Sequence, residues 1–225
     1  MAEIKAVLRD TRDEDMPRVE HFYLSAPEDK REYLVLHLED HQAALKKGFH
    51  FIVEHKGKIV AATMINPPST EESLYAEAGN TLIVGPVEGF RLQRFFLEIR
   101  AAALAVTEPG LLLTTGVNQK NKRSYKNISE TEELSPWDPP ENFYGLCNRC
   151  KWKVSLELER RCCCDFFLLD SDNQRKLVRR YLDRINGRSS LVLQNKGGSK
   201  LHLLLQSRWA TEDLHLRTLR AFADG

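Results

Sequence analysis

The sequence predicts an α/β fold of the α+β kind. Short apolar or alternating runs, which are typical of strands, are interspersed with segments whose apolar residues recur at helical spacing. The clearest example is a short apolar strand, residues 81–84, that enters a turn rich in glycine and proline. An amphipathic helix starts at once from that turn, and a second apolar strand follows at residues 111–117.

Length and composition describe an ordinary globular chain. It has 225 residues, of which 42% are hydrophobic and 29% are charged, enough for one or two domains with a hydrophobic core. No apolar run approaches the roughly 18–20 residues that span a bilayer. The N-terminus shows neither the apolar segment nor the cleavage site of a secretory signal, so we expect a cytoplasmic protein without membrane contact.

The first part of the chain predicts a strand, two helices and a hairpin. The strand covers residues 2–9, and Thr11 with Glu14 has the capping-box spacing that starts a helix. A second helix is expected to begin at Pro27 and to end before Gly48. Strands at 49–54 and 58–65 then flank a turn that contains Gly57.

The elements that follow are a strand, a helix, a strand and a short helix. They are expected at residues 75–84, 90–106, 111–117 and 118–127. Residues 135–140, rich in proline, form the most loop-like segment and divide the chain into a main domain, 1–134, and a C-terminal α+β segment, 141–225.

The C-terminal segment predicts two helices among strands. Residues 164–169 read as a strand, and Ser171 starts a capping box for a helix that closes at Asn186. A hairpin follows at 190–206, and Thr211 is expected to cap the last helix.

The turn that contains Gly85, Pro86 and Gly89 is a candidate phosphate-binding site. A strand that stops at a helix N-terminus leaves several backbone N–H groups without partners in one small space. Those donors and the helix dipole favour an anion.

The order of elements over residues 2–130 resembles that of the GNAT superfamily of acyl-CoA N-acyltransferases. The likeness rests on Leu82-Ile-Val-Gly-Pro86, on Gly89-Phe-Arg-Leu-Gln93 at the helix start, and on the asparagine-then-serine segment that contains Asn121 and Ser124. It implies a mixed, mainly antiparallel sheet with helices on both faces, extended by the C-terminal segment. It also implies acetyl-CoA as co-substrate, a primary amine as acceptor, and no metal.

The resemblance assigns roles to residues of this chain. Glu77 is the candidate base that deprotonates the amine, and Tyr125 is the candidate acid that protonates the departing thiolate; solvent exposure of Glu77 and packing of Tyr125 are the alternatives. The coenzyme is expected to contact Leu82, Ile83, Val84, Gly89, Phe90, Arg91, Leu92, Gln93, Arg94, Asn121 and Ser124.

Three residues depart from the family pattern at this turn. Glu88 stands where a cation or amide is usual, Arg91 replaces a glycine, and Gln93 replaces the final glycine or alanine. A side chain at position 91 obstructs close approach of a phosphate, and a carboxylate at position 88 has the wrong charge beside one. These departures motivate a second hypothesis, a non-catalytic binding or regulatory protein on the same fold.

Other signals point to weaker possibilities. The cysteines, at 147, 150 and 162–164, are read as small buried hydrophobes, with a zinc site or a redox role as alternatives. His37 and His41, one helical turn apart, are read as ordinary helix residues rather than metal ligands. The basic region 149–188 suggests a third hypothesis, association with nucleic acid, which we rank last because no aromatic single-strand motif accompanies it.

Overall fold

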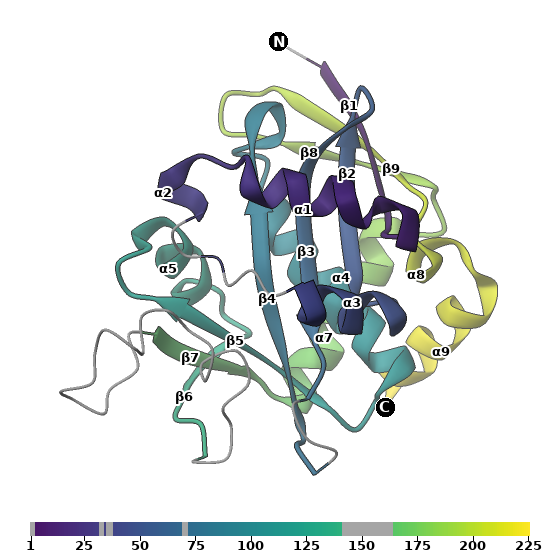
Figure 1. Cartoon of the computed structure of the whole chain (residues 1–225). Helices are drawn as coiled ribbons and strands as arrows, with labels where there is room; N and C mark the ends of the chain where they lie inside the picture. The colour runs from purple at the N-terminus through teal and green to yellow at the C-terminus, as the bar shows by residue number, and fades with distance from the viewer. Residues whose placement is uncertain (1–2, 32–33, 35–37, 69–71, 141–163) are drawn as a thin grey trace, which may run out of the picture.

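A computed structural model describes residues 3–31, 34, 38–68, 72–140 and 164–225 of the chain. Its strands form one sheet in the order β6-β7-β5-β4-β3-β2-β1-β9-β8 (Figure 1). The strands are Glu3–Asp10 (β1), His50–His55 (β2), Lys58–Asn66 (β3), Tyr75–Ile83 (β4), Leu112–Asn118 (β5), Ser135–Trp137 (β6), Cys164–Leu169 (β7), Ser190–Gln194 (β8) and Lys200–Leu205 (β9).

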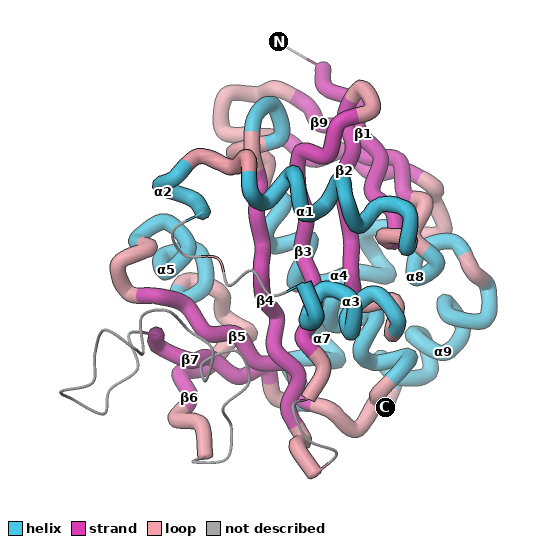
Figure 2. Tube along the Cα trace, viewed as in Figure 1, coloured by secondary structure: helices cyan, strands magenta, loops and turns pink. Residues whose placement is uncertain are grey.

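Helices cover both faces of this sheet, as the sequence predicts (Figures 1 and 2). In chain order they are Asp13–Asp15 (η1, a 3-10 helix), Met16–Leu24 (α1), Glu28–Arg31 (α2), Leu38–Lys46 (α3), Gly85–Val87 (η2, a 3-10 helix), Leu92–Thr107 (α4), Lys122–Ser129 (α5), Ser171–Ile185 (α7), Arg208–Thr211 (α8) and Asp213–Asp224 (α9). Helices α1 and α3 pack on one face, whereas α4, α7 and α9 pack together on the other.

The sheet is mixed and mainly antiparallel. All neighbouring strands run antiparallel except the pairs β1–β9 and β4–β5. The hairpin β8–β9 extends the sheet beyond β1, and β7 lies between β5 and β6. Strands from both sides of the expected division at residues 134–141 therefore share one sheet, and the division itself stays a prediction.

Helix α4 is the centre of the larger core. Twelve of its sixteen residues are buried, because the sheet covers one side of the helix and α7 and α9 cover another. A helix enclosed on several sides needs apolar or small residues around most of its circumference, which the alanine-rich stretch 101–105 supplies.

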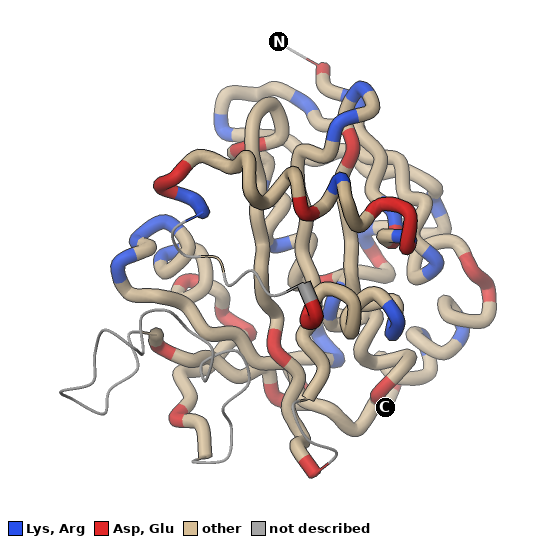
Figure 3. Tube along the Cα trace, viewed as in Figure 1, with Lys and Arg blue, Asp and Glu red and all other residues tan. Residues whose placement is uncertain are grey.

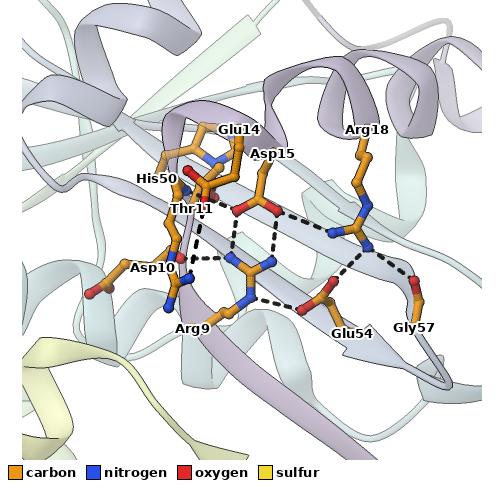
Figure 4. A network of polar contacts seen from close by, with 10 residues as sticks. Arg9, Asp10, Thr11, Glu14, Asp15, Arg18, His50, Glu54 and Gly57 are labelled. Carbon is orange, nitrogen blue, oxygen red and sulfur yellow. Dashed lines mark hydrogen bonds and ion pairs between the residues drawn. The ribbon is translucent and has the colours of Figure 1, made fainter.

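An ion-pair network fixes the start of α1 over β1 and β2 (Figure 4). The guanidinium of Arg9 donates to both carboxylate oxygens of Asp15, at 2.5 and 2.7 Å, and to Glu54 at 2.8 Å. Arg18 joins the same two carboxylates. The hydrogen bond from Arg9 outweighs the effect of burial and holds the pKa of Asp15 below its usual value.

Anchoring α1 places Tyr23 on the sheet beside a bulge in β4. Asn80 has a positive φ of 47°, and the β3–β4 register shifts between Ala62 and Met64. The hydroxyl of the fully buried Tyr23 donates to the Asn80 carbonyl at 2.6 Å. The backbone of the bulge is therefore held by a hydrogen bond from the α1 face of the sheet.

Several local expectations need correction. The helix expected from Pro27 to Gly48 is instead two, α2 and α3, and Leu34 is not helical. The capping box before α1 pairs Arg12 with Asp15, one residue beyond Thr11 and Glu14. Asp170, rather than Ser171, caps α7, because its carboxylate accepts from the amide of Asn173.

Two further expectations on the C-terminal half are wrong. The segment expected to be a loop at residues 135–140 begins with β6, which pairs with β7. The N-cap of α9 is Glu212, and Thr211 belongs to the preceding turn α8. The pairing of β6 with β7 is a contact between segments distant in sequence, which local patterns do not encode.

Candidate functional site

A cavity lies where the parallel strands β4 and β5 separate. Their pairing covers only Tyr75–Glu77 of β4 against Leu112–Thr114 of β5, and the hydroxyl of Thr115 makes a last link to the Ala78 carbonyl at 3.0 Å. Beyond it the strands diverge (Figure 2). A cavity of about 530 Å³ extends between them to the start of α4, with α2 and α5 at its sides.

Most of the expected coenzyme-binding residues line this cavity. They are Leu82, Ile83, Gly89, Arg91, Leu92, Gln93, Asn121 and Ser124. They come from β4, from the turn before α4 and from the start of α5. The cavity is therefore lined by segments, such as β4 and α5, that are about 40 residues apart in the sequence.

Three other expected residues lie elsewhere. Phe90 is buried in the hydrophobic core. The amide of Val84 donates to the Val60 carbonyl, and its side chain packs on the α1 side of the sheet. Arg94 turns toward Glu133, 3.7 Å away. None of the three lines the cavity.

The turn before α4 presents backbone donors to the cavity. Its chain direction changes at three residues with positive φ: Gly85, Gly89 and Arg91. In the part of the chain that the structure describes, the amides of residues 89–93 donate to no backbone acceptor. Unpaired donors at the N-terminus of a sixteen-residue helix are suited to an anion, so the anion site expected here stays a prediction.

The negative charge of Glu88 is compensated by neighbouring groups, so it does not repel an anion at the turn. Its carboxylate accepts from the Gly85 amide at 2.9 Å and forms ion pairs with Lys30 at 2.7 Å and Arg123 at 3.2 Å. Burial raises the pKa of Glu88, but these partners outweigh it and hold the pKa below the ordinary value. Glu88 thus orders the turn and links α2 to α5, and its charge is more than neutralised.

Cations surround the cavity mouth, and sequence reasoning missed most of them. Figure 3 shows Lys and Arg on α5 and at the end of α2. The lining includes Lys30, Arg91, Lys120, Lys122 and Arg123, with Asp29 as the acidic residue among them. The run 120–123 was a visible signal for a basic site, whereas Lys30 comes from a helix that no motif connects to the turn.

A polar link joins α4 to α5 across the cavity. Gln93 donates to the hydroxyl of Ser124 at 3.4 Å and accepts from Asn127 at 2.9 Å. Asn121 caps α5 by accepting from the Ser124 amide. The asparagine and serine of the expected motif therefore hold the start of α5 in place, and the glutamine that replaces a small residue contacts them.

Glu77 lies beside the cavity at the point where β4 and β5 separate. It is half-buried, and its Oε1 atom is 3.3 Å from where a Cβ on Gly116 would stand. That same position is 2.8 Å from the ring of Phe166, so only glycine fits at 116. Glu77 adjoins the lining residue Gly116 without itself lining the cavity.

Tyr125 projects toward β7 instead of the cavity. Its ring packs edge-on against Phe167, with centroids 6.3 Å apart, and its hydroxyl is hydrogen-bonded to the Asp165 carboxylate, which raises its pKa. Tyr125 thus lies on the β7 side of α5, and it does not line the cavity.

The remaining motifs fall mostly outside this site. Residues 147, 150, 162 and 163 of the cysteine group, and His37, lie outside the described residues, while Cys164 is half-buried at the start of β7. His41 is buried and hydrogen-bonded to His50 at 3.0 Å. Within the described ranges, no group of three or more His, Cys, Asp or Glu side chains is arranged to hold a metal.

The described part of the basic region, residues 164–188, includes β7 and helix α7, and several arginines of α7 form ion pairs within the protein. Arg184 binds Glu98, Arg180 binds Glu133 and Arg175 binds Asp172. Residues 149–163 of the region lie outside the described residues. No helix in the described part of the chain is long and apolar enough to cross a membrane.

Replacing Arg91 with glycine is expected to stabilise the fold and weaken anion binding. Arg91 has φ 57° and ψ 28°, a left-handed conformation that costs a non-glycine residue about 1 kcal/mol. Urea denaturation should show a gain of up to about 1 kcal/mol, while pyrophosphate affinity at low salt falls because a cation leaves the cavity. Arg91→Ala, the control, should lose affinity without the gain; equal stability of both variants would contradict the assignment of strain.

Solved structures share the fold of this chain. Arabidopsis thaliana Naa50 in complex with the bisubstrate analogue CoA-Ac-MVNAL matches with a TM-score of 0.52 and 12% identity, over 73% of this chain and 98% of that one. The GNAT domain of S. lividans PAT matches with a TM-score of 0.51 and 15% identity, over 72% of this chain and 89% of that one. No protein-family model and no curated protein matches the chain. The likeness shows the fold.

Proposed function

We propose that this chain, which has the GNAT fold, is an acyl-CoA-dependent N-acyltransferase that acts on a primary amine. The observation that carries the proposal is the continuous cavity from the separation of β4 and β5 to the free amides at the start of α4. Coenzyme A carries anionic phosphates, which suit the amides at the start of α4. Its pantetheine arm carries amides, which suit the strand edges where β4 and β5 separate.

The residues present fit coenzyme A. The amides of residues 89–93 are suited to the pyrophosphate, and Lys30, Arg91 and Arg123 supply positive charge beside it. The edge of β4 at residues 81–83 has no β5 partner, so its backbone groups, apart from the Ile83 carbonyl that accepts from Lys30, are available for the amides of the pantetheine arm. The turn therefore has the donors that the family pattern requires, although its side chains differ.

The acyl transfer needs one proton removed and one delivered. The amine nitrogen attacks the thioester carbonyl, the C–N bond forms, and the C–S bond breaks to release a thiolate. Glu77, beside the point where the strands separate, is the proposed acceptor of the amine proton. Tyr125, the donor that the resemblance implies, faces β7 and does not line the cavity, so the thiolate is proposed to take its proton from water.

Coenzyme A is expected to stabilise the protein saturably. At 100 times its Kd, a ligand that binds only the folded state adds about 2.7 kcal/mol to the free energy of unfolding, which thermal denaturation detects. Arg123→Met should weaken binding about threefold to tenfold, because it removes a cation of the cavity mouth. Arg217→Met, an exposed arginine on α9, is the control.

Two outcomes separate the hypotheses. The absence of saturable stabilisation at millimolar coenzyme A would contradict the proposed function. Binding without release of free thiol, measured with acetyl-CoA across a panel of primary amines, would favour the non-catalytic binding protein instead.

A further inference from the structure

Arg100 is a buried cation at the wall of the cavity. It lies in the third turn of α4, is 2% exposed, and lines the cavity between β4 and β5. Its Nε donates to the Phe96 carbonyl at 3.0 Å, and its Nη1 donates to the hydroxyls of Thr63 and Thr81 at 3.0 and 3.1 Å. The two threonine hydroxyls are themselves 2.7 Å apart, so the guanidinium is held in one orientation.

This charge has no counterion in the part of the chain that the structure describes. No carboxylate forms an ion pair with Arg100, and its Nη2 donates to no described residue. Burial lowers its pKa to about 10, with Tyr23 the one ionisable neighbour that acts on it, so the group stays charged at neutral pH. Glu98, also buried on α4, is by contrast bound through both oxygens to Arg184.

An uncompensated buried cation favours a ligand that brings a negative charge to it. A buried charge without its partner is strongly unfavourable, and supplying the partner removes that penalty. The neutral amides of a pantetheine arm accept a hydrogen bond but leave the charge uncompensated. A carboxylate would neutralise this charge. It would also accept hydrogen bonds from the guanidinium, whose Nη2 atom donates to no described residue.

The coenzyme phosphates do not reach this position while they occupy the turn. Arg100 is eight residues beyond Leu92, which is about 12 Å along the axis of α4. The acyl group is the end of the coenzyme farthest from its phosphates. It is therefore the part of an acyl-CoA that can carry a carboxylate to Arg100.

We propose that the acyl donor is a dicarboxylic acid monothioester of coenzyme A, of the malonyl or succinyl class, whose free carboxylate pairs with Arg100. This inference rests on the proposed function and replaces the acetyl group that the family resemblance implies. Thr63 and Thr81 act as positioning residues, because they hold the guanidinium before the donor arrives.

Calorimetry with matched thioesters tests the proposal. Succinyl-CoA is compared with butyryl-CoA, and malonyl-CoA with propionyl-CoA, because each pair has the same number of acyl carbons and differs in the terminal carboxylate. The wild-type protein is expected to bind at least one carboxylated donor more than tenfold tighter than its neutral match. In Arg100→Met this preference should disappear, while the affinity for free coenzyme A is retained.

The free protein supplies a second readout. Because Arg100 has no described counterion, Arg100→Met should melt no lower than the wild type, whereas a purely structural arginine would lower the melting temperature when removed. If free coenzyme A binds but neither carboxylated donor is preferred by the wild type, the acyl assignment is wrong and the proposed function stands. If no coenzyme A compound binds, both fail.

Discussion

Replacing Arg184 with methionine is expected to lower the free energy of unfolding by about 3–5 kcal/mol at pH 7.5. Glu98 has no exposed side-chain surface, and both of its oxygens accept from Arg184, each at 2.8 Å. Removal of the guanidinium strands a carboxylate between α4 and α7. The same pair ties the C-terminal helix α7 to the helix that starts at the anion site, so its loss is also expected to loosen that site.

The loss of stability in Arg184→Met should depend on pH. Burial raises the pKa of Glu98 above its ordinary 4.5 even with Arg184 present, and without Arg184 the pKa rises further. A folded state that holds a proton more tightly than the unfolded state gains stability below the unfolded pKa and loses it as pH rises through the folded pKa. The deficit relative to wild type should therefore be smaller at pH 5 than at pH 7.5.

Urea denaturation at the two pH values measures this effect. Arg179→Met is the matched control, since Arg179 is an exposed arginine on the same helix with no ion pair among the described residues. The proposal that Arg184→Met leaves the Glu98 carboxylate buried without its partner would be wrong in two cases. In the first, Arg184→Met and Arg179→Met lose the same free energy of unfolding. In the second, the loss in Arg184→Met is no smaller at pH 5 than at pH 7.5.

The parts of the fold that the sequence predicted depend on local patterns. The hairpin β2–β3 was expected from two apolar runs around Gly57, which indeed has a positive φ. The turn into α4 was expected from glycines and from apolar residues at helical spacing. Such signals lie within a dozen residues, and tertiary packing reinforces them instead of overriding them.

The parts that it did not predict depend on contacts between distant segments. The parallel pairing of β1 with β9 joins Glu3 to Lys200, and β7 inserts between β5 and β6. No residue of β9 marks β1 as its partner, because both are short apolar strands that would fit several neighbours. The break between α2 and α3 belongs here too: a continuous helical pattern predicted one helix.

The candidate site likewise has features that local sequence patterns predicted and features that depend on contacts between distant residues. Its backbone donors were predicted, because a strand–turn–helix sequence is local. The compensation of Glu88 by Lys30 was not, since those residues are 58 positions apart. Arg100 was missed for another reason: an arginine beside an alanine-rich stretch reads as a solvent-facing residue, and only its hydrogen bonds to Thr63 on β3 and Thr81 on β4 show that it faces the sheet.

Replacing Glu77 with glutamine is expected to lower kcat by about 10²–10⁴-fold while leaving the affinity for coenzyme A unchanged. The substitution keeps the shape beside Gly116, so the packing of Phe166 and the fold are preserved. It removes the group proposed to take the proton from the attacking amine. Thiol release on the amine that reacts fastest in the panel gives kcat, and calorimetry gives the coenzyme affinity.

The controls for Glu77→Gln separate chemistry from charge. Glu72→Gln removes the same charge from an exposed residue just before β4 and should leave kcat unchanged. Glu77→Asp keeps a carboxylate at a shorter reach, so it should recover part of the rate that glutamine loses. A kcat for Glu77→Gln within threefold of the wild type would remove Glu77 from the mechanism. Because coenzyme binding does not depend on this carboxylate, that result would leave the anion site and the acyl assignment intact.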